Sequence, residues 1–463
     1  MSESYTQQLS AFIAGLAYKD IPAEAVEQVK RITLHVIGVS LAAAPIGQTQ
    51  SAIALAEKRG GLPEATVWGG SGKKIPAENA AFANATIADI LDWEDCSWTG
   101  HPSAGAIPAA FALSEALGLS GQEYIAAVVA AYEGYQRIAM AVQPSAEYSA
   151  KHGWGLSSWQ IFSASLAAAR ALRLNSEKVN QTIGASVYAA PVPTNLHSSG
   201  NAKSDIYHYA HGTNAYNGVV AARLAESGFG NGLDYLDGPT GYWCNVSDQV
   251  DEGWYTKDLG KRWLICETYI KHWPANMWIQ TPLEILDQIY KERPFTAAEV
   301  AKIRLSPNTN LTSLSYPETG KTTLDAQFNA PFCLAAYILN PVPGAHWFTE
   351  DRLANPEVLK LASKFEAFGE KTTPWNHFAV FKKGSFPEMT VEIHLNNGTV
   401  LSKTGAFPKG HPQNNTTLEE EFELFRSITA PYLEKQKAEA VIAEISNLEN
   451  LENLQKIAGS IAG

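Results

Sequence analysis

Residues 21–44 read IPAEAVEQVKRITLHVIGVSLAAA, and their pattern is repeated over most of this chain. Pro22 stands where a helix can begin, because proline has no amide hydrogen to leave unpaired in the first turn. Apolar residues then recur at steps of three and four, from Val26 through Val29 to Val36 and Ile37. This spacing predicts a helix with one face in a core.

Similar stretches predict helix after helix up to about residue 265, where strand signals are scarce. They cover residues 77–91, 106–117, 121–141, 157–172, 176–190 and 213–225. Most are rich in alanine, which favours helices and allows them to pack closely. Residues 389–403 differ, because MTVEIHLNNGTVLSK alternates apolar residues around Asn397-Gly398, the pair typical of a tight hairpin turn. The helical pattern returns from residue 418 to the end.

This order predicts a mainly α protein with a smaller α+β domain. The large helical domain would be discontinuous in sequence and interrupted by the α+β domain. We expect residues 1–266 to form its first part, residues 267–405 the smaller domain, and residues 406–463 the C-terminal helices that complete it. A length of 463 residues suits two or three domains.

Composition excludes several classes of function. The chain has 35 basic and 47 acidic residues, a net charge of −12, whereas a general nucleic-acid binder needs a basic face. The same charge disfavours adhesion to anionic membranes. We expect neither a secretory signal nor a membrane span, since the long apolar runs that they need are missing. The 4 widely spaced cysteines, Cys96, Cys244, Cys266 and Cys333, predict free thiols in a cytoplasmic protein.

The most informative segment is LDWEDCSWTGHPSAGAIPA, residues 91–109. Asp92, Glu94 and Asp95 lie at the end of a predicted helix, and His101 follows six residues after Asp95. Clustered carboxylates raise one another's pKa, and one of them can hold a nearby imidazole charged and oriented. Such groups can move a proton at carbon. The alternative is a helix end followed by a solvated loop.

A second candidate segment is AEYSAKHGWGLSSWQ, residues 146–160, which places Tyr148 and His152 before a predicted helix start. Helix N-termini attract anions, so a carboxylate could bind here. The alternative is a polar loop between helices that is closed by aromatic side chains.

Two further segments carry basic residues. Residues 195–218 hold Lys203, His208 and His211, and residues 269–284 hold Lys271 at the predicted domain boundary. His208 and His211 could share a helix face as metal ligands, but no third ligand is evident and we expect no metal. A lysine near a substrate carboxylate would be its charge partner or, if desolvated, a base.

Several nucleotide and hydrolase motifs are missing. Residues 67–76, VWGGSGKKIP, lack the spacing of a phosphate-binding loop, and no strand leads into G-x-G-x-x-G. There is no G-x-S-x-G either. A dinucleotide-binding fold and a serine hydrolase are therefore not supported.

At these segments the chain resembles the MmgE/PrpD family, which includes 2-methylcitrate dehydratase, cis-aconitate decarboxylase and iminodisuccinate epimerase. The resemblance covers nearly the whole length. Its strongest motif is L-D-x-x-D followed by G-H-P-S at residues 91–103, and a second G-H-P lies at residues 410–412. The resemblance implies a discontinuous helical domain with a smaller α+β domain, a homodimer and no cofactor.

Site residues follow from the same resemblance. Asp92 and His101 match the family's active-site aspartate and histidine, and His152, Lys203 and Lys271 resemble its further histidine and lysines. Four positions depart from the residues that are frequent in the family: Gln280 replaces a histidine, Phe332 a tyrosine, His35 an aspartate and Cys96 a threonine.

We therefore expect a cofactor-independent enzyme that takes a proton from carbon next to a carboxylate. His152 or His101 would be the base, with Asp92 orienting an imidazole. Substrate binding would fall to Lys271, Gln280, Trp98 and Trp154, together with Lys203. A lyase of the dehydratase or decarboxylase type, acting on a small di- or tricarboxylate, is the first expectation.

Two alternatives stay open. An epimerase would return the proton on the opposite face of the carbon, with Tyr148 or Lys203 as the second group. A non-catalytic dimeric binding scaffold would keep the fold without turnover.

Overall fold

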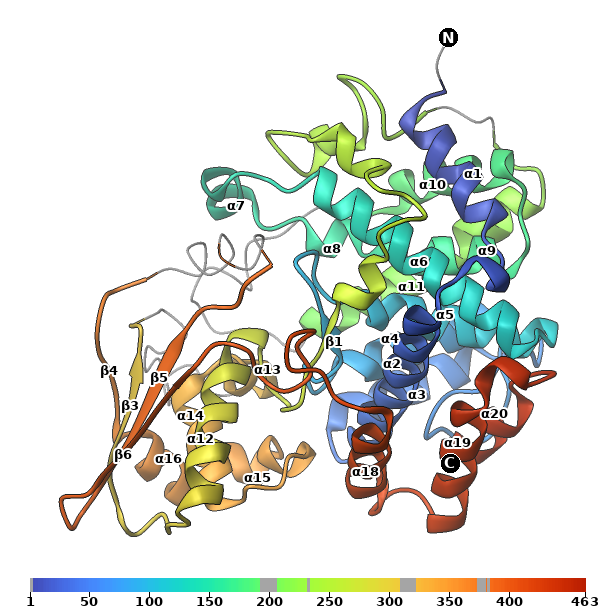
Figure 1. The fold of residues 1–463 in the computed structure, drawn as a ribbon. Coiled ribbons are helices and arrows are strands. Elements are labelled where there is room, and N and C mark those ends of the chain that lie inside the picture. Colours follow the sequence, from blue (N-terminus) through green and yellow to red (C-terminus); the bar gives the residue numbers. More distant parts are fainter. Residues whose placement is uncertain (1–2, 192–205, 231–233, 309–321, 373–379, 381–383) are drawn as a thin grey trace.

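The computed structural model describes residues 3–191, 206–230, 234–308, 322–372, 380 and 384–463. Figure 1 shows a large helical body and, at the lower left, a smaller part that holds a sheet. This arrangement confirms the predicted mainly α protein with a smaller α+β part.

Eleven of the described helices come from the first half of the chain. They are α1 (Tyr5–Gly15), α2 (Ala23–Ala42), α3 (Gly47–Arg59), α4 (Ala77–Asp89), α5 (Pro102–Leu117), α6 (Gly121–Ala141), α7 (Ala146–His152), α8 (Leu156–Trp159), α9 (Ile161–Ala171), α10 (Ser176–Ala189) and α11 (Ile206–Glu226). Helix α6 has the predicted bounds, and its start is fixed by a capping box between Ser120 and Glu123.

Two helices begin earlier than predicted. Helix α5 starts at Pro102 instead of residue 106, because the Asp95 carboxylate accepts a hydrogen bond from the Ser103 amide at 3.0 Å. Helix α11 starts at Ile206 instead of residue 213, and its first turns are polar. His208 and His211 are nevertheless buried there, so tertiary contacts override the polar local pattern.

The smaller part contains a four-stranded sheet in the order β4-β3-β5-β6. Its strands are β3 (Val300–Ser306), β4 (Phe365–Ala367), β5 (Met389–Leu395) and β6 (Val400–Gly405). Strands β5 and β6 form the predicted hairpin, while β3 runs parallel to β4 and antiparallel to β5.

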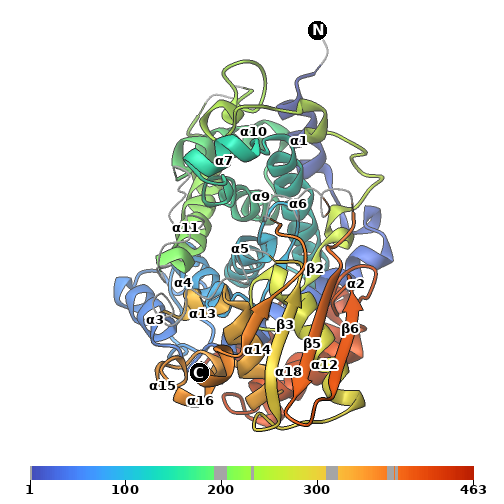
Figure 2. The ribbon, with the colours of Figure 1, turned by 90° about the vertical axis from the view of Figure 1, so that its left-hand side faces the viewer.

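The smaller part also contains helices, and the first of them packs against β5 and β6. They are α12 (Gln280–Glu292), α13 (Thr323–Gln327), α14 (Ala330–Leu339), α15 (Glu350–Leu353) and α16 (Pro356–Ala362). Figure 2 shows the sheet toward the viewer with α12 and α14 behind it, between the sheet and the helical body. Alternate residues of β5 are buried, from Met389 to Leu395, as a strand with one covered face requires.

The chain then returns to the helical body through α18 (Leu418–Thr429), α19 (Lys435–Ser446) and α20 (Gln455–Ile461). In Figure 1 these red helices lie beside the blue N-terminal ones. Phe425 of α18 packs so closely on α2 that a Cβ atom at Gly38 would lie 2.9 Å from its ring. Lys30 of α2 also pairs with Glu449 at 2.5 Å. The helical body is thus built from both ends of the chain, while the boundaries at residues 266 and 405 stay predictions.

A short two-stranded ladder joins distant segments between the two parts. Strand β1 (Asp95–Cys96) pairs antiparallel with β2 (Tyr269–Ile270). Gly410 packs against β2, where a side chain would collide with the Ile270 carbonyl oxygen, 1.8 Å from the position of a Cβ atom. The second G-H-P segment therefore needs glycine to reach this ladder.

All four cysteines are free thiols, as predicted, and Cys96 and Cys333 are buried. Within the described ranges no single helix is long and apolar enough to cross a membrane, although α2 and α3 would qualify as a pair bent by 102°.

Candidate active site

The L-D-x-x-D motif forms a turn that gathers three buried carboxylates. Helix α4 ends at Asp89, and the Asp92 amide donates to the Asp89 carbonyl at 2.8 Å. Asp92 has a φ of 47°, a left-handed conformation that is rare for residues other than glycine. Asp89, Asp92 and Glu94 are all fully buried. A strained turn that holds buried charges is a common feature of functional sites.

The β1–β2 ladder places Lys271 in this turn. The Lys271 amide donates to the Glu94 carbonyl at 3.2 Å. Its Nζ atom donates to the Asp92 carbonyl at 2.9 Å and to Asp92 Oδ1 at 2.5 Å, and it lies 3.4 Å from Glu94 Oε1. These three acceptors match the three donors of an ammonium group, so the charge of Lys271 is already fully paired.

His101 lies against the same carboxylates. It is the N-cap residue of α5, and its Nδ1 atom makes a short hydrogen bond with Glu94 Oε1. Asp92 Oδ1 is farther from this nitrogen, at 3.9 Å. Glu94, and not the expected Asp92, is therefore the carboxylate that orients the imidazole. The other ring nitrogen, Nε2, lies 3.4 Å from the Tyr207 hydroxyl.

Helix α11 adds two further histidines. His208 Nδ1 lies 2.5 Å from Asp89 Oδ2, and His211 Nε2 lies 3.4 Å from Asp89 Oδ1. The rings of His211 and His101 meet edge to face at 5.5 Å. Gly212 allows this approach, because a Cβ atom there would lie 2.0 Å from Thr86 Oγ1 of α4.

Burial and mutual charge set the ionisation of the cluster. Burial raises the pKa of Asp89, and the charge of Glu94 raises it further. Burial also raises the pKa of Glu94, but the charges of Lys271 and His101 outweigh burial and lower this pKa below its ordinary value. Burial and Lys271 oppose protonation of His101, yet Glu94 raises its pKa above the ordinary value. Burial and His101 lower the pKa of His211. These shifts favour the anionic form of Glu94, the protonated form of His101 and the neutral form of His211.

The cluster also has the spacing of a metal site. Ligand atoms of Asp89, Asp92, Glu94 and His101 all lie within 4.8 Å of one another. The Lys271 ammonium, however, is bonded to Asp92 and lies beside Glu94. It therefore already supplies a cation to these carboxylates.

The predicted residues His152 and Tyr148 lie elsewhere. Both belong to α7, which Figure 1 shows at the edge of the helical body. His152 is exposed and Tyr148 half-buried, and their rings pack on each other at 4.5 Å. Their hydrogen bond and ring contact among the described residues stay within α7 and its N-cap, Ser145. Lys203 lies outside the described residues.

Gln280 holds a loop in the structure. Its Oε1 atom accepts from the amides of His272 and Trp273 at 3.1 and 3.0 Å. Its Nε2 atom donates to the carbonyls of Trp273 and Ala275, both at 2.7 Å. The side chain is fully buried, and these four bonds use its hydrogen-bonding capacity. This placement favours a role in shaping the loop after Lys271.

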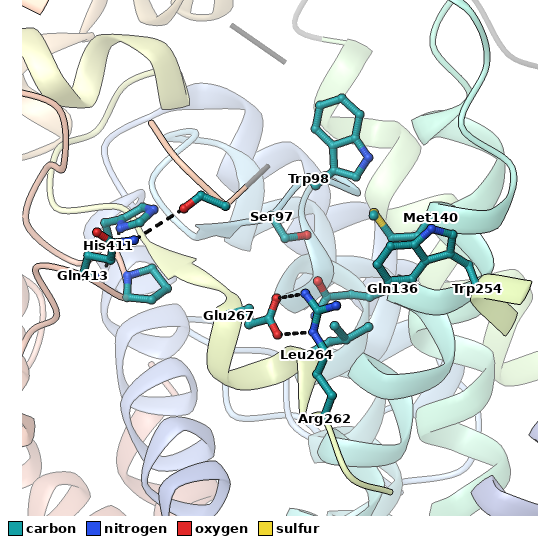
Figure 3. Close-up of a pocket in the computed structure, with 12 residues that line it drawn as sticks. Ser97, Trp98, Gln136, Met140, Trp254, Arg262, Leu264, Glu267, His411 and Gln413 are labelled. Carbon is teal, nitrogen blue, oxygen red and sulfur yellow. Dashed lines mark hydrogen bonds and ion pairs between the residues drawn. The ribbon is translucent and has the colours of Figure 1, made fainter. Parts of the chain in front are cut away.

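The two tryptophans that were predicted to bind substrate, Trp154 and Trp98, lie in different parts of the structure. Trp154 donates from Nε1 to Gln143 at 3.0 Å. Trp98 lines a pocket of about 260 Å³ near the domain boundary, shown in Figure 3. Met140 and Trp254 also line this pocket. Arg262 and Glu267 form an ion pair there, with distances of 2.5 and 2.6 Å. The residues that line this pocket do not include those of the buried cluster.

Sequence reasoning missed Asp89 and Tyr207 and gave Asp92 the contact that Glu94 makes. The three-residue spacing of His208 and His211 was the available signal for α11. Its partner, Asp89, lies 119 residues from His208 in the chain, so no local pattern connects them.

The mainly helical fold thus surrounds a buried cluster of carboxylates, imidazoles and an ammonium group, the group types that acid–base chemistry uses. The sequence model of the MmgE/PrpD N-terminal domain matches residues 7–252, and that of the MmgE/PrpD C-terminal domain matches residues 273–450. The chain therefore belongs to the MmgE/PrpD family, which confirms the resemblance found in the sequence.

Two relatives are cis-aconitate decarboxylases. The protein from Homo sapiens is 23% identical over 387 residues, which cover 79% of this chain and 77% of the relative. The protein from Mus musculus is 22% identical over 460 residues, which cover 96% of this chain and 91% of the relative. Family and relatives together indicate a lyase.

Proposed function

We propose that this chain is a decarboxylase- or dehydratase-type lyase that acts on a small di- or tricarboxylate and uses His101 as its general acid. The observation that carries this proposal is the buried Glu94–His101 pair beside the Lys271–Asp92 pair. Glu94 keeps the imidazole protonated and fixes its orientation. The Nε2 atom then remains to deliver a proton.

The acid is suited to either reaction. In a decarboxylation the bond from carbon to a carboxylate breaks, CO₂ leaves and the electron pair stays on the substrate as an enolate. His101 Nε2–H then protonates the carbon. In a dehydration a base removes a hydrogen next to a carboxylate, and His101 protonates the departing hydroxyl, which leaves as water. Such acid–base assistance contributes about 10²–10⁴-fold to a rate.

Lys271 is assigned a different role from the one expected. Its three donors are bonded within the protein, so it holds Asp92 and Glu94 in place and provides a fixed positive charge near the reacting carbon. We assign substrate carboxylate binding to Lys203. This residue precedes the first residue of α11 by three positions, and α11 carries Tyr207 and His208 into the cluster.

We also propose that the reaction needs no metal or organic cofactor. The support is the position of Lys271, whose ammonium already neutralises the carboxylates that could bind a metal. Activity should survive incubation with EDTA. Loss of activity with EDTA and its return with zinc would contradict this part of the proposal.

The epimerase alternative has less support. It requires two acid–base groups on opposite faces of one carbon. His101 Nε2 and the Tyr207 hydroxyl are neighbours at 3.4 Å and so approach a substrate from one side. The scaffold alternative gives no reason for a buried cluster of charged groups, whose desolvation costs stability even when the charges are paired. The homodimer and the cytoplasmic location stay predictions.

Proton NMR in D₂O tests the proposal, with cis-aconitate and a panel of hydroxy and unsaturated di- and tricarboxylates. We expect either loss of CO₂ with deuterium entering the product at carbon, or loss of water to a vinyl product without new deuterium at carbon. Either reaction should lose most of its rate in His101→Gln. His152→Gln serves as the comparison and should retain most of the rate. Inversion without elimination would replace the proposal by an epimerase. No turnover by the folded protein on any member of the panel would contradict a carboxylate lyase.

A further inference from the structure

A second buried charged pair lies directly behind the candidate active site. His35 of α2 and Glu421 of α18 are only 3% and 2% exposed. His35 Nδ1 lies 3.1 Å from Glu421 Oε2, and His35 Nε2 lies 2.7 Å from the Trp93 carbonyl oxygen. The other oxygen of Glu421 accepts a hydrogen bond from Thr416 Oγ1 at 2.6 Å. Both ends of the imidazole are therefore held.

The hydrogen-bond partners determine where the protons lie. A carbonyl oxygen only accepts, so His35 Nε2 must carry a hydrogen and donate it to Trp93. Burial disfavours a charge on His35, but the hydrogen bond and charge of Glu421 outweigh it and raise the pKa of His35. Burial acts against ionisation of Glu421 too, yet His35 lowers its pKa. The pair is thus an imidazolium and a carboxylate, with Asp95 facing His35 and His272 facing Glu421.

The contact with Trp93 completes a row of held carbonyls in the strained turn. Lys271 Nζ binds the Asp92 carbonyl at 2.9 Å, and the Lys271 amide binds the Glu94 carbonyl at 3.2 Å. His35 holds the carbonyl of Trp93, which lies between them, at 2.7 Å. Three successive peptide groups are fixed in this way. The orientation of the Asp92 and Glu94 side chains depends on these peptides.

We propose that His35 is a positioning residue for the acid–base cluster: paired with Glu421, it holds the Trp93 carbonyl and thereby aims Asp92 and Glu94 at Lys271 and His101. The last helices of the chain, through Glu421, thus support the geometry of the site. This inference rests on the proposed function.

Three variants and a matched control test the inference. His35→Leu removes the donor, His35→Gln keeps an N–H donor without the charge, and Glu421→Gln removes the charge partner. Tyr124→Phe is the control. It deletes a buried hydrogen bond of 2.9 Å between the Tyr124 hydroxyl and Thr33, which lies on α2 as His35 does, and it leaves the residues of the turn unchanged. We expect kcat to fall about 10²-fold in His35→Leu with a smaller change in KM, since small misplacements of catalytic groups have such effects. His35→Gln should recover part of the rate, and Tyr124→Phe should keep it.

A second measurement does not depend on turnover. Nuclear magnetic resonance of ¹⁵N-histidine-labelled wild-type protein should show both ring nitrogens of His35 protonated at neutral pH. In the Glu421→Gln variant, the same measurement should show a neutral His35 ring. The His101 signals should shift in His35→Leu and not in Tyr124→Phe. If the wild type turns over no carboxylate but these shifts occur, the proposed function fails while the positioning role stands. Unchanged kcat and unchanged His101 signals in a folded His35→Leu protein would overturn the inference, as would equal losses in Tyr124→Phe.

Discussion

Glu94 is the residue on which the chemistry of the site depends. Its Oε1 atom makes a short hydrogen bond with His101 Nδ1 and lies 3.4 Å from Lys271 Nζ. One side chain therefore links the candidate acid to the fixed cation. Asp95, the next residue in the chain, has a different task, since it caps α5 and accepts from Tyr132 at 2.5 Å.

Replacing His101 by glutamine should remove the proton donor and keep the fold. We expect kcat/KM to fall by about 10²–10⁴-fold, the usual contribution of a general acid. Steady-state kinetics measures this loss, and thermal unfolding followed by circular dichroism checks the fold. A folded variant with wild-type kcat/KM would exclude His101 as the acid.

Replacing Glu94 by glutamine should change the pH dependence of the reaction. His101 acts in its protonated form, so activity is lost as pH rises through its pKa. Glu94 raises that pKa, whereas burial and Lys271 lower it. Without the carboxylate, the alkaline limb of the kcat/KM profile should move to lower pH. Asp95→Asn is the control and should leave the position of the limb unchanged. A limb at the same pH in Glu94→Gln would show that another group controls it.

At the scale of elements, helix α11 decides what lies opposite the carboxylates. It packs on α4 at Gly212, one residue after His211. That close approach brings His208 and His211 to Asp89. A helix that packed farther out would leave the Asp89 carboxylate buried without these partners.

Substituting alanine for Gly212 should push the two helices apart. The new Cβ atom would lie 2.0 Å from Thr86 Oγ1 and 2.7 Å from the Phe82 carbonyl oxygen, which belongs to the backbone and cannot rotate away. Overpacking of this kind costs about 1–3 kcal/mol. Urea unfolding measures the change in the free energy of unfolding. Gly15→Ala is the matched control, because nothing lies within 4 Å of its Cβ position, and it should be neutral or stabilising. Equal stability of the two variants would contradict the close packing described for α11.

At the scale of the whole molecule, the C-terminal helices belong to the body formed by the first half of the chain. Phe425 is 1% exposed and packs on α2 at Gly38, whereas Ile393 belongs to β5 and is fully buried on the covered face of the distant sheet. A mutation in the last sixty residues should therefore affect the N-terminal helices more than the sheet that precedes it in sequence.

Truncating Phe425 to alanine tests this connection. Loss of a buried phenylalanine costs about 3–5 kcal/mol. Native-state hydrogen exchange should show reduced protection first in α2 and α18, while β5 and β6 keep theirs. Ile393→Ala should produce the reverse pattern. The same loss of protection everywhere in both variants would mean that the two parts unfold as one cooperative unit.

The sequence by itself determined the elements whose signals are local. The helical pattern placed α6 at residues 121–141, and Asn397-Gly398 with its alternating flanks gave the β5–β6 hairpin. Motif spacing also identified His101, Asp92 and Lys271 as candidates. These features depend on neighbours a few residues apart, so periodicity and turn chemistry suffice to find them.

Only the tertiary structure decided how those residues are paired. Lys271 and Asp92 are 179 residues apart and meet because β1 pairs with β2. The left-handed conformation of Asp92 turns its carboxylate to Lys271 and leaves His101 to Glu94. The start of α11 likewise depends on Asp89, a partner in another helix. Such contacts depend on strand pairing, close helix packing and burial, which no short stretch of sequence contains, and they set the charges on which the proposed reaction depends.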